Sequence, residues 1–396
     1  MKFLKISFKV IVYGFALIGV ILTAGFFAVK YNLTNVVAVV DKNSDAYQAA
    51  AQNFSYAGLS TTGSSSVATS SGDSLENINN KMAELNSSSQ ELANLKVKKI
   101  QELCQLDVVG KIYPVNARNI ILAYQSGASQ WSFDQMILAL SLRAGNDSEF
   151  SNKIKACLNL KDGNYNEAQI ISLFKDASSS NAFPWANDES WDVVTAAILK
   201  DEVAIKRAAA DAGINPRLIV ADLVVEQLRL YNTQREFYEK FFKPLQILAN
   251  ANKMAWGVMA IKEATAIDIE NNLKNKNSFF YLGPQYENIL DFVNTPDVAK
   301  ARYDRLTNPK DHYYSYLYGA LLIKQVINQW ENKGYNISNR PELIATLFNI
   351  GFMKSSPKDN PQVGGSIITL DNVDYTFGSL AHEFYYSNLI PNFPMN

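Results

Sequence analysis

The sequence has 396 residues, of which 47% are hydrophobic and 12% aromatic, enough apolar material for one large or two ordinary packed domains. Its 37 basic and 38 acidic residues leave a formal net charge of -1. That balance lacks the basic excess that nucleic-acid phosphates demand, so no nucleic-acid partner is expected. The two histidines and two cysteines show no zinc-ligand spacing, and neither a metal site nor a cofactor is expected.

The N-terminus contains an apolar run of membrane length. Twenty uncharged residues, VIVYGFALIGVILTAGFFAV, lie between Lys9 and Lys30, and a helix of that length spans a hydrocarbon core of about 30 Å. The lysines before the run predict a cytoplasmic tail over 1–9, a single transmembrane helix over 10–29 and an extracytoplasmic location for the rest of the chain. The alternative is a cleaved signal peptide, although its apolar core usually has only about 7 to 15 residues.

A linker and a small helical module are expected next. Residues 30–101 predict an extracytoplasmic Ser-rich linker, because STTGSSSVATSSGDS has too little apolar surface to order itself. The second half of this segment also permits a short polar helix. Residues 102–185 show helical periodicity and predict an accessory module, with Ser132 as a candidate N-cap. Cys104 and Cys157 fall in this module, and a disulfide between them is permitted outside the cytoplasm but not required.

Residues 186–396 form a second helical block, which we expect to be one domain. A long alanine-rich helix ends at Gly213 in the manner of a C-cap. Asn215 and Pro216 then supply an N-cap and a first helical residue for the next helix. The remaining expected elements are helices within 313–334 and 340–351 and a β-hairpin that turns at Asp371 and Asn372. The predicted fold class is therefore mainly α with a small β element.

The helix that starts at Pro216 reads LIVADLVVEQLRLY, apolar on almost every face yet with charged residues inside it. Asp222, Glu226 and Arg229 are four and three residues apart and therefore share one face. A carboxylate walled by apolar residues is desolvated, which favours its protonated form, whereas Arg229 favours the charged form. Cleavage of a glycosidic bond needs a protonated acid, because the leaving oxygen must receive a proton. The alternative is a surface ion pair between Glu226 and Arg229.

Three downstream stretches resemble, in order, motifs of the lysozyme-like superfamily, most closely of the lytic transglycosylases that cut bacterial peptidoglycan. In that family the catalytic glutamate at the end of a helix is followed by Gly-Leu-Met-Gln-Ile-Met-Pro-x-Thr-Ala, and WGVMAIKEATA is in register with this segment. NPKDHYYSYLYGALLI is similar to the family's Asn/Asp-Pro lead into a helix, and ATLFNIG to its Tyr-Asn-x-Gly motif. The resemblance covers roughly residues 188 to 390. The matching residues are Gly257, Val258, Met259, Ile261, Thr265, Ala266, Gly319, Phe348, Asn349 and Gly351.

The resemblance implies a lysozyme-like catalytic domain over 186–396 that cleaves the β-1,4 bond between MurNAc and GlcNAc, with Glu226 as the single general acid and base. The sugar's N-acetyl and 6-hydroxyl groups complete such a transglycosylase reaction, while hydrolysis by water, as in a muramidase, stays open. Asp222 is then either a supporting residue or a surface charge. The expected partners are peptidoglycan strands and, through the N-terminal helix, the cytoplasmic membrane. The candidate substrate-binding residues are Gln227, Arg229, Gly257, Met259, Ala260, Phe348, Asn349 and Tyr313.

The chain also departs from the family's pattern. Gln227 stands where the family has Ser, Ala260 replaces its Gln, and Glu263 replaces its Pro. These departures support an alternative function, a glycan-binding or scaffolding protein of the cell envelope that has the fold without the chemistry. A third possibility is a membrane-tethered assembly factor whose motif matches are accidental. The candidates to replace the amide of the family's Gln are the side chains of Gln227, Asn250 and Asn252.

Overall fold

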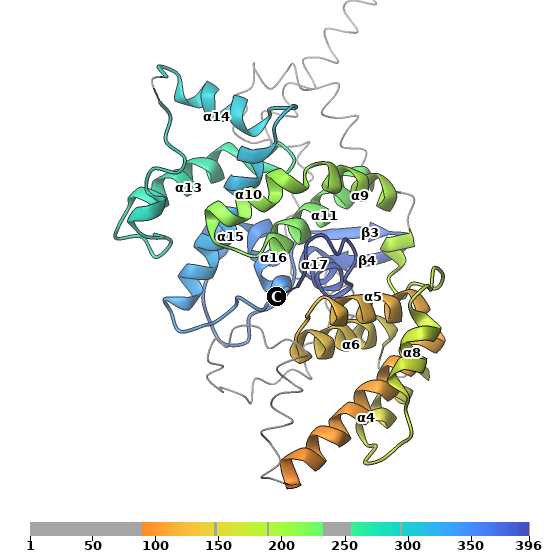
Figure 1. Ribbon diagram of the computed structural model, residues 1–396. Coiled ribbons are helices and arrows are strands. Elements are labelled where there is room, and N and C mark those ends of the chain that lie inside the picture. Colours follow the sequence, from red (N-terminus) through yellow and green to blue (C-terminus); the bar gives the residue numbers. More distant parts are fainter. Residues whose placement is uncertain (1–88, 146–148, 188–189, 233–254, 294, 396) are drawn as a thin grey trace, which may run out of the picture.

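The computed structural model describes residues 89–145, 149–187, 190–232, 255–293 and 295–395. Within these residues, thirteen α-helices and two short antiparallel hairpins form a mainly α fold, as the sequence predicts (Figure 1). The expected transmembrane helix over 10–29 lies outside the described residues, as does most of the expected linker. Among the helices in the described part of the chain, none has the length and hydropathy that crossing a bilayer requires.

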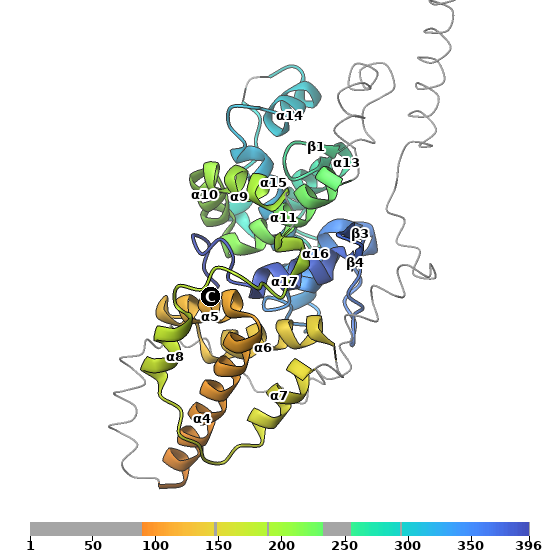
Figure 2. The same cartoon turned by 90° about the vertical axis from the view of Figure 1, so that its right-hand side faces the viewer.

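The range of the expected accessory module is filled by five helices, and the first of them begins earlier than 102. This helix starts where the sequence permits a short polar helix, and its N-terminal end extends away from the rest of the protein (Figures 1 and 2). The N-cap of the third helix is Ser129 and not Ser132, because the Ser129 hydroxyl accepts a hydrogen bond from the Ser132 amide at 3.2 Å. The five helices are α4 (Ser89–Ile112), α5 (Pro114–Gln125), α6 (Gln130–Ala144), α7 (Glu149–Leu158) and α8 (Glu167–Phe174).

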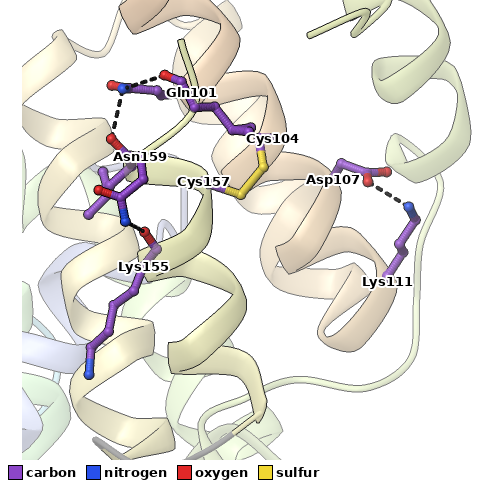
Figure 3. Close-up of a disulfide and its surroundings, with 9 residues drawn as sticks. Gln101, Cys104, Asp107, Lys111, Lys155, Cys157 and Asn159 are labelled. Carbon is purple, nitrogen blue, oxygen red and sulfur yellow. Dashed lines mark hydrogen bonds and ion pairs between the residues drawn. A yellow bond between two sulfur atoms is a disulfide. The ribbon is translucent and has the colours of Figure 1, made fainter. Parts of the chain in front are cut away.

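A disulfide joins α4 to α7. Cys104 and Cys157 are bonded, with their Cα atoms 5.6 Å apart (Figure 3). The disulfide that the sequence permits but does not require is therefore formed. Beside the bond, the Gln101 side-chain amide donates to the backbone carbonyls of Leu158 at 2.8 Å and Leu160 at 3.0 Å (Figure 3). The end of α7 is therefore held to α4 by covalent and hydrogen bonds together.

In the second helical block, one of the expected helices is divided in two. The long helix before Gly213 is two helices with a break at Asp201, whose carboxylate contacts His312 and accepts a hydrogen bond from the Tyr316 hydroxyl at 2.7 Å. Gly213 ends the second of the two in the left-handed conformation (φ 66°, ψ 47°), as predicted. The helices are α9 (Ser190–Lys200), α10 (Glu202–Ala212), α11 (Pro216–Asn232), α13 (Glu263–Lys274), α14 (Val298–Leu306), α15 (Tyr313–Glu331), α16 (Pro341–Ile350) and α17 (Phe377–Tyr386), with short 3-10 turns η1 (Pro184–Asn187), η2 (Pro284–Tyr286) and η3 (Phe352–Lys354).

Two hairpins accompany these helices. β3 (Ile367–Leu370) and β4 (Val373–Thr376) pair across a two-residue turn. Asp371 and Asn372 form this turn with φ values of 50° and 59°, the positive pair that a tight hairpin requires, so the predicted hairpin is confirmed. The second hairpin joins β1 (Ala255–Trp256) to β2 (Ile261–Lys262). Its strands have two residues each, too few to leave a periodic signal in the sequence.

The accessory helices and the second block share one hydrophobic core, and α17 lies at their junction (Figure 1). Glu383 of α17 is buried there, where its carboxylate accepts hydrogen bonds from Arg143 Nε of α6 at 2.7 Å and from Trp185 Nε1 at 2.8 Å. Burial raises the pKa of Glu383, and Arg143 and Trp185 oppose that rise. The buried carboxylate thus ties three segments of the chain together.

A second buried charge fastens the start of α11 to the end of the chain. The guanidinium of Arg217 is fully buried and donates to the backbone carbonyls of Tyr385 at 2.8 Å, Phe384 at 3.0 Å and Phe393 at 2.6 Å. Burial lowers the pKa of Arg217 to about 10, so the group stays charged at neutral pH. The predicted cap is also present, because Asn215 Oδ1 accepts a hydrogen bond from the Arg217 amide at 2.8 Å.

Replacement of the cap should destabilise the protein. Asn215→Ala removes the acceptor for the first turn of α11, and we expect the free energy of unfolding to fall by about 1 kcal/mol. Urea denaturation measures this loss. Asn277→Ala, a change at an exposed turn residue, is the matched control and should stay within about 0.5 kcal/mol of the parent. Equal stability of the two variants would show that Asn215 does not act as a cap.

Loss of the disulfide should cost more. The bond closes a loop with a sequence separation of 53, for which the chain-entropy treatment gives roughly 4 kcal/mol. We expect the double variant Cys104→Ser, Cys157→Ser to unfold at correspondingly lower urea concentration, and the parent in excess dithiothreitol to match it. If reductant leaves the unfolding curve of the parent unchanged, the bond contributes nothing to stability.

Candidate active site

The central feature of the site is an ion pair within α11. The helices α9, α10, α15, α16 and α17 pack around α11, and Glu226 is left only 4% exposed. Arg229 Nε donates to Glu226 Oε2 at 3.1 Å, and Arg229 Nη2 donates to the same oxygen. For the side-chain atoms alone, the exposed fraction is 6% in Glu226 and 16% in Arg229. The ion pair that the spacing predicts is therefore present, but it is buried and not on the surface.

Asp222 lies one helical turn before Glu226 and is 1% exposed, so the surface-charge alternative is wrong. Neither carboxyl oxygen has a hydrogen-bond partner among the described residues. Burial, and secondly the nearby charge of Glu226, raises the pKa of Asp222 well above its usual value. Asp222 is thus a buried carboxyl group whose protonated form is favoured by its surroundings.

Gln227 connects this part of α11 to the first hairpin. Its side-chain amide donates to the carbonyl of Val258 at 2.9 Å, in the four-residue turn 257–260 between β1 and β2. Ala260 closes the turn with a positive φ of 50° and donates its amide hydrogen to the Gly257 carbonyl at 3.1 Å. This hydrogen bond fastens the turn to α11 at the residue that follows Glu226. Gln227 therefore has a structural role here, and one of its two amide hydrogens is already in use.

The turn is seated on α15 by close contacts that demand small residues. A Cβ at Gly257, whose φ is +68°, would lie 2.0 Å from the Leu306 carbonyl oxygen and 2.7 Å from Ser315 Oγ. Ser315 Oγ accepts a hydrogen bond from the Met259 amide at 3.2 Å. The Met259 side chain is fully buried against Gly319, where a Cβ would lie 2.8 Å from the Met259 methyl group. Two of the stretches that carry the family resemblance therefore touch each other.

Asn349 occupies the end of α16, which also packs against α11. Its Oδ1 accepts hydrogen bonds from the Ser366 amide at 2.9 Å and from the Ser366 hydroxyl at 3.0 Å. A protein group thus satisfies the amide oxygen, while no described residue accepts a hydrogen bond from Nδ2. Phe348, beside it, is buried and belongs to the core.

The structure does not join Tyr313 to the other candidates by any contact among the described residues. Its hydroxyl donates to Asp211 of α10 at 2.6 Å, and the Arg207 guanidinium lies 4.0 Å from the centre of its ring. Burial, with the hydrogen bond to Asp211, raises the pKa of Tyr313. The hydroxyls of two further α15 tyrosines are also occupied, that of Tyr316 by Asp201 and that of Tyr318 by Glu270.

Two contact residues, Ser315 and Ser366, were not among the residues selected from the sequence. Ser315 interrupts the aromatic run YYSYLYG, a polar residue in an otherwise apolar stretch, and that contrast is the signal that identifies it. Ser366 has no such signal. The proposed replacements Asn250 and Asn252 lie outside the described residues. In the described part of the chain, no three His, Cys, Asp or Glu side chains are grouped so as to hold a metal ion.

Comparison of the chain with known proteins finds no matching family model, no matching curated protein and no matching solved structure. The likeness to lytic transglycosylases therefore depends on the motif residues and on the contacts between them.

The buried neutral acid should appear in the pH dependence of stability. Because the folded-state pKa of Asp222 is raised, the unfolded chain releases this proton near pH 4 while the folded protein keeps it. Asp222 therefore lowers the free energy of unfolding as pH rises above about 4, by up to about 1.4 kcal/mol per pH unit, until the folded-state pKa is reached. Asp222→Asn removes this loss, so the stability of the variant relative to the parent should increase from pH 4 to pH 7.

Urea denaturation at several pH values measures the difference. Asp192→Asn, at an exposed position of α9, is the matched control and should follow the parent at every pH. A constant difference between the Asp222→Asn variant and the parent would show that Asp222 is ionised in the folded protein.

Proposed function

We propose that this protein is a membrane-anchored enzyme that cleaves the glycan strands of peptidoglycan, of the lytic transglycosylase type. The observation that carries the proposal is the convergence on α11 of stretches that lie far apart in the sequence. The turn 257–260 reaches α11 through Gln227, α15 holds that turn and packs on α11, and α16 brings Asn349 to the same helix. These are the segments that resemble the family's motifs.

In the proposed reaction Glu226 is the catalytic residue. Its carboxylic acid gives a proton to the glycosidic oxygen between MurNAc and GlcNAc as that bond breaks. The resulting carboxylate then takes a proton from the sugar's own 6-hydroxyl, which closes a 1,6-anhydro ring, or from a water molecule, which leaves a reducing end. The burial of Glu226 on the helix against which α15 and α16 pack supports this role.

Other residues would position the substrate. The Nδ2 group of Asn349 has donors that no described residue binds, and these suit an N-acetyl carbonyl oxygen. The turn 257–260, which is hydrogen-bonded to α11 through Gln227, offers backbone groups, and Gly257 is exposed there. Ala260 lacks the amide of the family's Gln, so we assign substrate contacts at this point to the backbone of the turn.

The proposed location is outside the cytoplasm, with residues 10–29 as a single membrane anchor. The disulfide between Cys104 and Cys157 supports this location, because such bonds persist in oxidising compartments and are rare in the cytosol. The segment between the anchor and α4 would then give the enzyme its reach into the cell wall.

A second candidate function is a glycan-binding or scaffolding protein with the same fold. Two observations favour it: Ala260 replaces the family's Gln, and Arg229 holds Glu226 in an ion pair. An ion-paired carboxylate is a poor proton donor as it stands.

Substitution of Glu226 separates the two functions. Glu226→Gln is nearly isosteric but has no acidic proton, so the rate of strand cleavage should fall by roughly 10² to 10⁴ while strand binding persists. The assay is digestion of purified peptidoglycan by the full-length protein in detergent, with sedimentation of the strands to measure binding. Mass spectrometry of the parent's digest tells anhydro ends from reducing ends, which differ by one water.

Glu149→Gln, an exposed change in α7, is the matched control and should digest strands as the parent does. Full activity of the Glu226→Gln variant would remove the catalytic role from Glu226. A parent that binds strands without cutting them would establish the scaffolding function instead.

A further inference from the structure

The ion pair between Glu226 and Arg229 conflicts with the proton-donating role on which the proposed function rests. Two guanidinium nitrogens donate to one oxygen of Glu226, and an adjacent cation stabilises a carboxylate over its protonated form. In this arrangement Glu226 is unable to give a proton. The pair must therefore open before the reaction begins.

Opening the pair leaves a buried carboxylate and a partly buried guanidinium, and each needs compensation. Glu226 is compensated by taking up a proton. Arg229 has no such route, because a guanidinium does not lose its proton in proteins and must meet an anion instead. The question is which anion is within reach of Arg229.

In the described helices packed around α11, every acidic group except the exposed Asp192 of α9 already has a partner. Asp222 is neutral and stands seven positions before Arg229, about two helical turns away. Burial lowers the pKa of His382 to about 4, which leaves that ring uncharged at neutral pH, and the buried Arg217 is saturated by carbonyls. The engaged carboxylates are Asp201 with His312 and Tyr316, Asp211 with Tyr313 and Arg207, Glu342 with Arg340, and Glu383 with Arg143.

Arg229 is placed to receive an anion from outside the protein. It is the more exposed member of the pair, 16% against 6% for Glu226. Its Nε and Nη2 bind Glu226, and no described residue accepts a hydrogen bond from its third nitrogen, Nη1. A guanidinium fork matches the geometry of a carboxylate and binds it through two parallel hydrogen bonds.

We propose that Arg229 recognises a carboxylate carried by the glycan substrate, and that its transfer from Glu226 to this carboxylate allows Glu226 to become the proton donor. The step conserves charge and atoms. The guanidinium stays protonated and exchanges one carboxylate for another, while Glu226 takes one proton from solvent and forms one O–H bond. With Asp222 already neutral, the site then contains two uncharged acids. The substrate is thus a glycan with a carboxylate near the scissile bond, as the lactyl and peptide groups of peptidoglycan provide.

The test compares one preparation of peptidoglycan strands in two forms, untreated and with its carboxylates converted to amides by carbodiimide and ammonia. We expect the parent to lose about ten- to hundredfold in kcat/KM on the amidated strands, the range for a hydrogen-bonded charged group. Arg229→Gln should cleave both forms equally. Arg229→Lys keeps the charge without the fork and should retain a smaller preference. Lys153→Gln, an exposed change in α7, is the control and should discriminate as the parent does.

A second measurement follows the proton and does not depend on turnover. Infrared difference spectra should show one additional protonated carboxyl when untreated strand fragments bind the parent, and none when they bind Arg229→Gln or Glu226→Gln. Equal cleavage of the two strand forms by the parent, or binding without proton uptake, would overturn the role of Arg229 and leave the proposed function intact. Failure of the parent to cut either form would refute the proposed function, and the inference with it.

Discussion

The structure depends on the burial of α11 on every side. A helix packed against five others offers little solvent-exposed surface for a charge. Nevertheless α11 contains Arg217, Asp222 and Glu226, all of them buried. Each charge is accommodated by a different physical means. Arg217 is surrounded by backbone carbonyls, Asp222 keeps its proton, and Glu226 shares an ion pair with Arg229. The chemistry available to the protein follows from these three solutions, because burial sets the protonation state of each group and the neighbours decide which groups stay charged.

The surroundings of Glu226 are assembled by contacts that tolerate almost no added volume. Gly257 and Gly319 each lie where a Cβ would clash, so the turn 257–260 closely approaches the last residue of α14 at Gly257 and α15 at Gly319. The single hydrogen bond from Gln227 to Val258 then transmits the position of this turn to α11. The turn is thus closely packed on the α15 side, whereas the ion pair at Glu226 is the element that the proposed reaction requires to rearrange.

Much of the helical layout could be predicted because its signals are local. Gly213 ends one helix and Asn215 begins the next, and the positive φ values of Asp371 and Asn372 suit the residue types found there. The break at Asp201 escaped prediction, since its partner His312 is 111 residues further along the chain. The same distinction applies to the site. The Glu226–Arg229 pair follows from spacing along a helix. The spacing does not show that Asp222 is buried, and its burial excludes the interpretation as a surface charge. The carbonyl that accepts the hydrogen bond of Gln227 lies 31 residues away in the sequence.

The way Arg217 is bound has a consequence for the order in which the protein matures. The carbonyls that satisfy its guanidinium belong to residues 167 to 176 positions later, close to the last residue of the chain. Until those residues have emerged from the ribosome, the start of α11 would bury a cation with nothing to accept its hydrogen bonds. The first turn of α11 therefore cannot reach its final packing on an incomplete chain. A polypeptide that lacks those residues would carry Glu226, on the same helix, in an unfinished setting.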